Sequence, residues 1–66
     1  MILDGFKIRQ FRLKANLSQF DLGLEVDLTK EHICQLECEK RKNTSLETAS
    51  KLSKYFKVSI EEIIKN

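Results

Sequence analysis

The chain has 66 residues, which is room for a single domain, expected to span residues 1–66. Proline is absent and glycine occurs only twice, so the composition favours a helical bundle over a barrel or sandwich, which needs more turn residues. No apolar run approaches the roughly 20 residues that span a membrane, and the first residues have no signal-peptide pattern. We therefore expect a cytoplasmic protein with no membrane partner.

The net charge is only +2, but the charges are unevenly distributed along the chain. Segment 1–17 carries a net +3, segment 18–39 a net −5, segment 40–58 a net +5, and segment 59–66 a net −1. The two basic segments can supply cations to phosphates, whereas the acidic middle opposes binding to a polyanion.

The first half of the chain carries the signals of two successive helices. Asp4 can cap a first helix that continues to about Ala15, and Asn16 suits the left-handed residue that often ends a helix. Ser18 is a good N-cap for a second helix, and Asp21, three residues later, completes a capping box with a short acid.

A third helix follows after a very short turn. Asp27 tolerates the positive φ that such a turn needs, and Thr29 caps a helix that we expect to end near Glu37 or Cys38. Gly23 interrupts the second helix and indicates that another helix passes close to it. The inward residues of these two helices are expected to be Leu22, Val26, Ile33 and Leu36.

The last third of the chain contains a polar loop at 39–45 and two further helices. Ser45 or Thr44 caps a fourth helix, whose expected core residues are Leu46, Ala49, Leu52 and Phe56. Ser59 caps a last short helix, with Glu62 as its capping-box partner. The residues of this last helix expected to face inward are Ile60, Ile63 and Ile64.

Two short helices joined by a tight turn make up a helix-turn-helix unit, here expected at about 18–38. Motifs occur around it in this order: Ile8-Arg9-x-x-Arg12, Leu17-Ser18-Gln19-x-x-Leu22-Gly23, Leu28-Thr29-x-x-x-Ile33-x-x-Leu36-Glu37, Ser45-Leu46-Glu47-Thr48 and Phe56-x-Val58-Ser59. Together they resemble the Cro and lambda-repressor-like helix-turn-helix family of bacterial and phage regulators, also called the xenobiotic-response-element family. The resemblance implies an all-α fold, a compact five-helix lambda-repressor-like DNA-binding domain with the helix-turn-helix at helices 2 and 3.

The resemblance also implies that the third helix enters the major groove of duplex DNA. Its outer residues are then the candidates for base contacts: Lys30, Glu31, His32, Cys34 and Gln35. Gln35 offers the donor and acceptor that adenine requires, Glu31 can accept from a cytosine amino group, and Lys30 can reach guanine or phosphate. Without the resemblance, the same residues are an ordinary solvated helix face.

Candidates for phosphate contacts lie at the start of the second helix and in the loop after the third: Ser18, Gln19, Lys40, Arg41, Lys42 and Asn43. Backbone N–H groups at a helix start and nearby cations both suit a phosphate. A basic run is commonly just a solvated loop, but this one directly follows the helix that would read the bases. By resemblance, Arg12 pairs with Glu37, a structural contact that locks the first helix to the end of the third.

Some positions depart from the family's usual residues. Asp27 and Glu39 stand where the family usually has Gly, Gly23 where it has Ala, and Thr44 where it has Pro. Asp27 is tolerable in a turn, but Glu39 places a negative charge near the negative pole of the helix dipole and near DNA.

Family members usually dimerise, and a module this small needs two copies on a roughly palindromic site to read enough bases. We expect a homodimer built from apolar residues that the core leaves over, first in the last helix and then in the N-terminal arm: Ile60, Ile63, Ile64, Met1, Ile2 and Leu3. Three other apolar residues, Leu13, Phe20 and Leu24, fall outside the core stripes and indicate a partner surface.

Cys34 and Cys38 are spaced i, i+4, unlike the C-x-x-C spacing of redox and zinc motifs, and no second ligand pair accompanies nearby His32. We expect two reduced thiols and no metal. The sequence has no nucleophile–base pair and no phosphate loop, so we expect no enzyme activity, no cofactor and no small-molecule ligand.

These features together predict sequence-specific binding of double-stranded DNA by a small bacterial or phage-encoded transcriptional regulator, with repression favoured. The acidic segment 18–39 supports an alternative, in which the helix-turn-helix fold serves as a protein–protein interaction module without reading DNA directly. The salt dependence of duplex binding separates the two.

Overall fold

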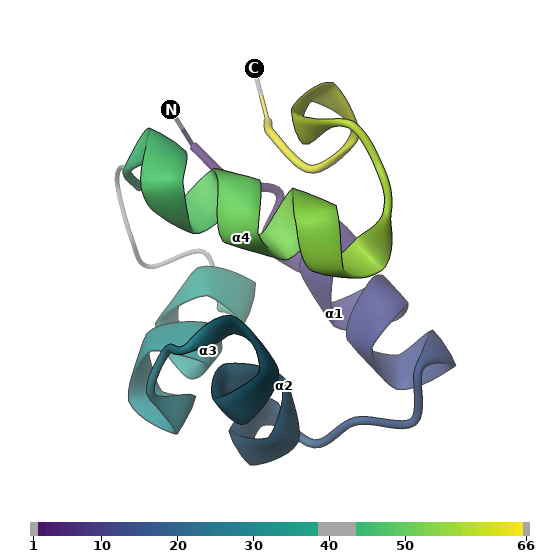
Figure 1. Ribbon diagram of the computed structural model, residues 1–66, viewed down its shortest axis with the longest axis vertical. Helices are drawn as coiled ribbons and strands as arrows, with labels where there is room; N and C mark the ends of the chain where they lie inside the picture. Colours follow the sequence, from purple (N-terminus) through teal and green to yellow (C-terminus); the bar gives the residue numbers. More distant parts are fainter. Residues whose placement is uncertain (1, 39–43, 66) are drawn as a thin grey trace.

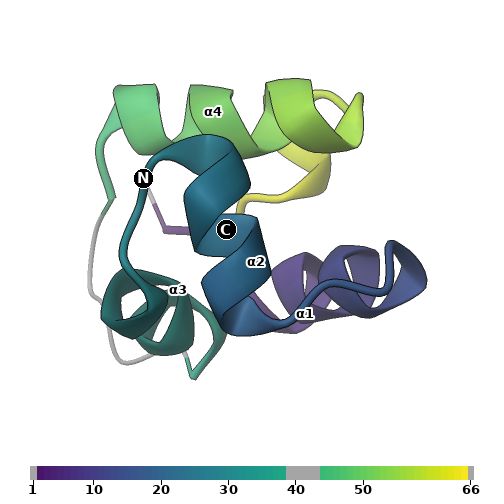
Figure 2. The ribbon, with the colours of Figure 1, turned by 60° about the horizontal axis from the view of Figure 1, so that its bottom comes forward.

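The computed structural model describes residues 2–38 and 44–65. These residues form α1 (Gly5–Lys14), α2 (Gln19–Val26), α3 (Lys30–Glu37), α4 (Leu46–Phe56) and the 3-10 helix η1 (Ile60–Glu62). Figure 2 shows α4 along the top of the molecule, α1 and α3 below it, and α2 standing between them; in Figure 1 α4 lies at the top and α2 at the bottom. The all-helical expectation is confirmed, with the last short helix a 3-10 turn. No helix within the described ranges is long and apolar enough to cross a membrane.

The starts of the α-helices are fixed by side-chain caps. Each cap oxygen accepts a hydrogen bond from the backbone N–H three residues later, and the cap residues are Asp4, Ser18, Thr29 and Ser45. Ser18 and Asp21 form the expected capping box, in which each side chain binds the other residue's backbone N–H. A cap of this kind contributes about 1 kcal/mol to stability. The caps predicted for the four α-helices are therefore confirmed, with Ser45 rather than Thr44 capping α4. At η1, Ser59 N–H donates to Glu62 Oε2 at 3.2 Å.

Helices α1, α2 and α4 end in the same way, with a residue in the left-handed region. Its φ is 59° at Asn16, 60° at Asp27 and 59° at Lys57. The next residue's N–H returns to a carbonyl five residues earlier, as Leu28 N–H does to Gly23 at 2.8 Å. Asn16 and Asp27 were expected here; Lys57 was not, because a lysine in this conformation costs about 1–2 kcal/mol. The returning bonds satisfy otherwise unpaired helix carbonyls and offset that cost.

The hydrophobic core is built from all four α-helices and both ends of the described chain. Its largest fully buried side chains are Ile8, Leu22, Ile33, Leu52 and Ile63, with Leu3, Val26, Leu36 and Ala49 beside them. The rings of Phe11 and Phe56 stack at its edge, with centroids 5.4 Å apart. The inward stripes expected for α2 and α3 are confirmed.

Leu46 was expected in the core, and this prediction is wrong: the side chain is 61% exposed. Two successive steps of three residues separate Leu46 from Leu52, and each falls about 60° short of a full helical turn, so Leu46 points about 120° away from the buried face. Thr48 and Ser53 occupy the inward positions instead, 8% and 6% exposed. A short hydroxyl side chain can be buried there because its oxygen is bonded locally, as Ser53 Oγ is to the Ser50 carbonyl at 3.1 Å.

The glycines mark two close approaches of backbone to backbone. A Cβ at Gly23 would lie 2.5 Å from the carbonyl oxygen of Leu28, so the turn after α2, rather than a neighbouring helix surface, requires glycine. A Cβ at Gly5 would collide with the carbonyl oxygens of Leu36 and Glu37. The start of α1 is therefore pressed against the last turn of α3.

The two ends of the described chain pair with each other. Leu3 and Ile64 form an antiparallel bridge, and Lys65 N–H donates to the Ile2 carbonyl at 2.7 Å. The two ends of the described chain accordingly lie together beside α4 (Figure 1). This pairing corrects the dimer prediction for two residues. Leu3 is 5% exposed and Ile63 is 0% exposed, so their side chains serve the core and are not available to a second copy.

Candidate nucleic-acid interface

Helix α3 has a buried side and an exposed side. Ile33 and Leu36 anchor it in the core, whereas Lys30, Glu31 and Gln35 are exposed. Glu31 and Gln35 are four residues apart, so they stack on one face of the helix. These exposed residues form a polar stripe along a helix that packing holds at one side only, which is the arrangement needed to enter a groove.

The other two candidates for base contacts are less accessible. His32 and Cys34 are both half-buried. His32 lies four residues before buried Leu36, so it sits on the flank of α3 that turns toward the core. The structure therefore divides the predicted set into three exposed residues on the outward face and two at its border.

An ion pair fixes the direction of α3 relative to α1. Arg12 Nε donates to Glu37 Oε2 at 2.6 Å, and Arg12 Nη2 donates to Glu37 Oε1 at 3.0 Å. Arg12 Nη1 also donates to the Leu17 carbonyl at 2.8 Å. The expected pair is thus present, and it joins α1, the connection to α2 and the end of α3.

Gln19, a predicted phosphate contact, takes part in the same network. Its Nε2 donates to Glu37 Oε1 at 3.2 Å, so its side chain is engaged within the protein. The first backbone N–H groups of α2 have no acceptor within the helix and suit an anion. Asp21 lies in this turn, with its carboxylate accepting from Ser18 N–H at 3.2 Å, and its negative charge opposes a phosphate there.

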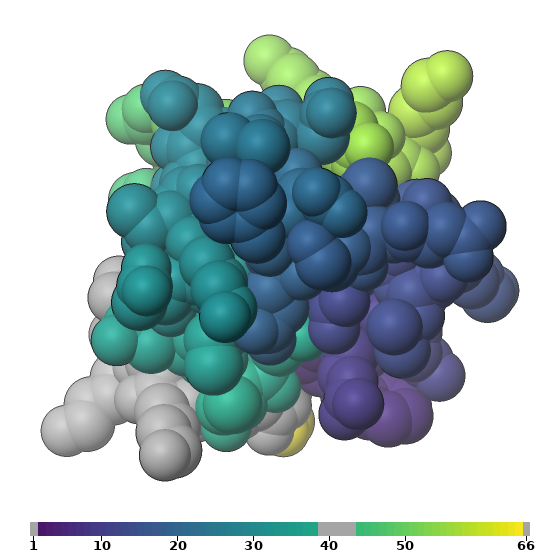
Figure 3. Space-filling model, turned by 90° about the horizontal axis from the view of Figure 1, so that it is seen from below, coloured from purple at the N-terminus to yellow at the C-terminus, as the bar shows by residue number. Residues whose placement is uncertain are grey.

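A small hollow of about 140 Å³ lies where α1, α2 and the end of α3 meet; its lining residues are Arg9, Arg12, Gln19, Glu37 and Cys38. Exposed Arg9 brings a cation to the start of α2 and the end of α3. Figure 3 shows that α1, α2 and α3 share one face of the molecule. Arg9 was not among the residues expected to contact phosphate; its signals in the sequence are its place in the motif Ile8-Arg9-x-x-Arg12 and the net +3 of segment 1–17.

A model of the helix-turn-helix family matches residues 8–63. The chain belongs to this family of transcriptional regulators. It is 39% identical over 64 residues to control protein C.BamHI of Bacillus amyloliquefaciens, covering 96% of this chain and 78% of that protein.

Solved structures of helix-turn-helix regulators share this arrangement. The restriction-modification controller protein C.AhdI of Aeromonas hydrophila is 28% identical with a TM-score of 0.78, covering 88% of this chain and 86% of that one. SinR of Bacillus subtilis, a master regulator of biofilm formation solved in complex with DNA, is 24% identical with a TM-score of 0.79, covering 86% of this chain and 90% of that one. These relatives are regulatory proteins, not enzymes.

Four predicted phosphate contacts, Lys40, Arg41, Lys42 and Asn43, lie outside the described residues.

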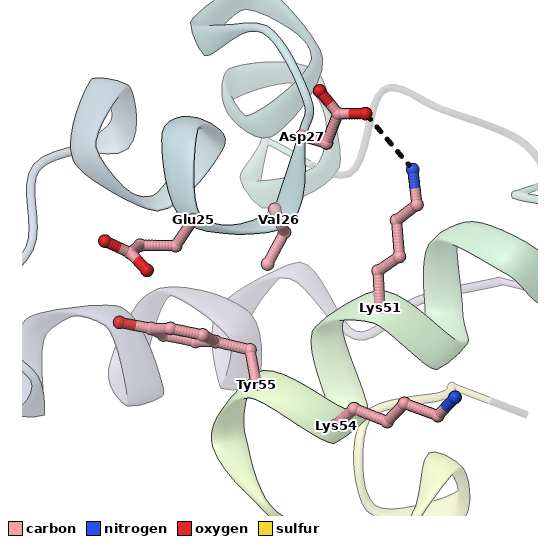
Figure 4. Close-up of a pocket in the computed structure, with 6 residues that line it drawn as sticks. All are labelled: Glu25, Val26, Asp27, Lys51, Lys54 and Tyr55. Atoms are coloured by element: carbon pink, nitrogen blue, oxygen red, sulfur yellow. Dashed lines mark ion pairs between the residues drawn. The ribbon is translucent and has the colours of Figure 1, made fainter.

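A larger hollow, of about 420 Å³, lies on the other side of this helix-turn-helix domain, between the end of α2 and α4 (Figure 4). It brings together Glu25, Val26, Asp27, Lys51, Lys54 and Tyr55, none of them a predicted site residue. Lys51 Nζ lies 4.0 Å from Asp27 and 3.6 Å from Glu47, so the charges here partly neutralise one another. In the described part of the chain no group of three or more His, Cys, Asp or Glu side chains is placed to hold a metal ion.

Proposed function

We propose that the protein binds double-stranded DNA at specific sequences by placing α3 in the major groove, and that it represses transcription from the sites it occupies. The observation that carries this proposal is the exposed stripe of Lys30, Glu31 and Gln35 on a helix anchored by buried residues. A side chain reads bases only if its backbone is held in a fixed orientation. Here the Thr29 cap fixes the start of α3, and the ion pair of Glu37 with Arg12 fixes its end.

The relatives support this proposal. SinR, which shares the fold, has been solved in complex with DNA, and C.AhdI is described as a restriction-modification controller. We extend the controller role to this chain, because C.BamHI, its relative at 39% identity, is also described as a control protein. The protein would then act in the cytoplasm of a bacterium, on promoters of genes for restriction and modification enzymes.

Phosphate contacts would surround the reading stripe. Arg9 on α1 and the first backbone N–H groups of α2 flank it on one side, and the basic run at 40–42 follows it in the chain. Each cation that meets a phosphate releases counterions and strengthens binding to any duplex. Gln19 contributes through its backbone N–H, because its side chain is bonded to Glu37, and Ser18 through its hydroxyl, because its backbone N–H is bonded to Asp21.

The acidic residues near the site favour specific over non-specific binding. Glu31 is exposed on the reading face, and Asp21 lies at the start of α2. Both carboxylates repel phosphates on any duplex, while Glu31 can recover part of that cost only where a cytosine amino group donates to it. The affinity for random DNA therefore falls more than the affinity for a matching site.

A homodimer would place two copies of α3 one DNA turn apart, at about 34 Å, on a roughly palindromic operator. We place the dimer contact at the paired terminal segments. Leu3 and Ile63 are buried there, but other apolar side chains of these segments remain accessible. Ile2 is 46% exposed, and Ile60 and Ile64 are half-buried. Met1, the remaining candidate, lies outside the described residues.

Selection of bound fragments from random duplex DNA, at one stated salt concentration, tests this function. We expect enrichment of a single motif with two-fold symmetry and half-sites centred about 10 base pairs apart. The enriched duplex should then be compared with fragments from upstream of the protein's own gene. Absence of any enriched motif, with the protein shown to be folded, would contradict sequence-specific reading.

A protein-interaction module is the second candidate, because large apolar side chains on α1 and α2 are exposed, among them Leu13, Phe20 and Leu24. Phe20 and Leu24 are four residues apart and form a continuous apolar strip on α2. This candidate predicts that the protein does not bind duplex DNA, so the salt dependence of duplex binding separates it from the first candidate.

A further inference from the structure

The two cysteines lie one turn apart at the end of α3, the helix assigned to DNA reading. Their sulfur atoms are 3.9 Å apart. Cys38 is exposed and is the C-cap residue of the helix, and Cys34 is half-buried. Lys30, Cys34 and Cys38 follow one another at intervals of four residues, so the thiols continue the exposed face on which Lys30 lies.

We propose that Cys34 and Cys38 are a redox switch: oxidation by a hydroperoxide joins them in an intrahelical disulfide that weakens DNA binding, and reduction restores it. The DNA readout rests on the function proposed above. The formation of the bond does not, because it depends only on the two thiols and the oxidant.

The position of the pair at the helix end makes the bond possible. Side chains four residues apart on a helix have Cβ atoms about 5–6 Å apart, whereas a disulfide holds its Cβ atoms at about 3.5–4.5 Å. The last turn must therefore tighten or unwind to bring the sulfurs into bonding distance. In mid-helix both flanking turns would resist this change, but Cys38 ends the helix, and its N–H makes the last regular bond to the Cys34 carbonyl at 2.9 Å.

The same strain makes the bond reversible. A disulfide that departs from its preferred geometry is more easily reduced, and exposed, strained disulfides are the ones that cellular thiols open. A bond between these two positions is suited to a regulatory role rather than to permanent stabilisation of the fold.

Cys38 is placed to react first. It lines the hollow of about 140 Å³ at the meeting of α1, α2 and α3, which is large enough for a small peroxide. Its sulfur attacks one peroxide oxygen, the O–O bond breaks, and hydrogen peroxide leaves one oxygen on Cys38 as a sulfenic acid and releases the other as water. The Cys34 sulfur then attacks the Cys38 sulfur, and the sulfenic oxygen departs as a second water. In total, two thiols lose two electrons and two protons, and one peroxide is reduced to two waters.

Formation of the bond disturbs the reading helix at two points. Gln35 and Glu37 both lie between the joined residues, and Glu37 holds α3 to Arg12 through contacts of 2.6 Å and 3.0 Å. A change in the last turn shifts these side chains together. Loss of one well-placed base contact costs roughly tenfold in affinity, so we expect the oxidised protein to bind its preferred duplex about ten times more weakly.

The first measurement concerns the bond and needs no DNA. The full chain is reduced, treated with hydrogen peroxide and analysed by intact mass spectrometry and non-reducing gel. We expect a monomer lighter by two hydrogen atoms, restored by dithiothreitol, and no such species from Cys34→Ser or Cys38→Ser. A disulfide-linked dimer, or stepwise addition of oxygen without loss of the two hydrogens, overturns the proposal.

The second measurement compares each protein's affinity for the selected duplex before and after peroxide, with far-ultraviolet circular dichroism to confirm folding. The wild type should lose about tenfold and recover with dithiothreitol, whereas Cys38→Ser should keep its own starting affinity. If the bond forms without a change in affinity, or if Cys38→Ser loses as much as the wild type, the switch is overturned. If the reduced wild type binds no selected duplex, the proposed function fails, and the proposed switch on DNA binding fails with it. The mass measurement still decides whether the disulfide forms.

Discussion

Arg12 and Glu37 meet through a two-point ion pair that joins α1 to the last residue of α3. The guanidinium donates to both carboxylate oxygens, at 2.6 Å and 3.0 Å, and the two side chains are only 9% and 3% exposed. Gln19 donates to the same carboxylate and Arg12 to the Leu17 carbonyl, so the pair has hydrogen-bond partners on both sides. A buried pair with its remaining groups bonded orients the elements it connects, which here include the reading helix.

Breaking this pair from one side should destabilise the protein strongly. Arg12→Met or Glu37→Gln leaves the partner's charge buried and uncompensated, which costs about 3 kcal/mol. The double variant leaves no such charge and should lose less than the sum of the two single losses. Urea unfolding of all four proteins measures this coupling, and strictly additive losses would show that the two side chains do not interact in solution.

Gly5→Ala should also destabilise the fold, although alanine is the better helix former. The added Cβ meets the carbonyl oxygens of Leu36 and Glu37, backbone atoms that cannot move without shifting α3. Overpacking of this kind costs about 1–3 kcal/mol. Gln10→Ala, at an exposed position of the same helix, is the matched control and should change stability by less than about 0.5 kcal/mol. A Gly5→Ala protein as stable as the wild type in urea would contradict the close approach.

The dependence of DNA affinity on salt tests the phosphate contacts. Arg9→Ala should flatten the slope of log affinity against log salt by about one unit on every duplex, because one phosphate contact is lost. Lys40→Ala and Arg41→Ala should each do the same. Lys54→Ala, on the α4 side of the molecule, is the control and should leave the slope unchanged. Equal slopes for Arg9→Ala and the wild type remove α1 from the footprint.

Self-association through the terminal segments is tested by sedimentation, both free and on a palindromic duplex. We expect a dimer on the duplex, weakened by Ile2→Asp because a charge would then lie in an apolar contact. Leu24→Asp, an exposed apolar position on α2, is the control and should sediment as the wild type. A wild-type protein that is monomeric in both conditions rules out the proposed homodimer.

Much of the fold could be predicted because its signals are local. A cap such as Ser18 with Asp21, or a left-handed residue such as Asn16, depends on a few neighbouring residues, and the structure places these where the sequence predicts them. The ion pair between Arg12 and Glu37, which are 25 residues apart, could be predicted only from the family resemblance, because no residue near either of them in the sequence indicates its partner.

The features that were missed depend on contacts between distant segments. Leu3 was assigned to a dimer surface because the pairing of the two chain ends, which buries it, leaves no local pattern; Ile63 was expected both to face inward and to serve the dimer, and its burial confirms only the first. Gly5 is required by the end of α3, and Arg9 joins the site because α1 packs against α3 and so brings Arg9 to the start of α2. Leu46 was misplaced because spacings of three residues drift around a helix when repeated.

The measurement that tests base reading most directly is a titration of Gln35→Ala and Glu31→Ala against a preferred and a scrambled duplex. Gln35→Ala should lose about 1–3 kcal/mol on the preferred duplex, relax the preference at one base pair and leave the scrambled duplex unaffected. Glu31→Ala should bind the scrambled duplex more tightly, because a charge that repels phosphates is removed, and so narrow the gap between the two duplexes. If both variants match the wild type on both duplexes, the outward face of α3 does not read bases, and the protein-interaction role becomes the better account.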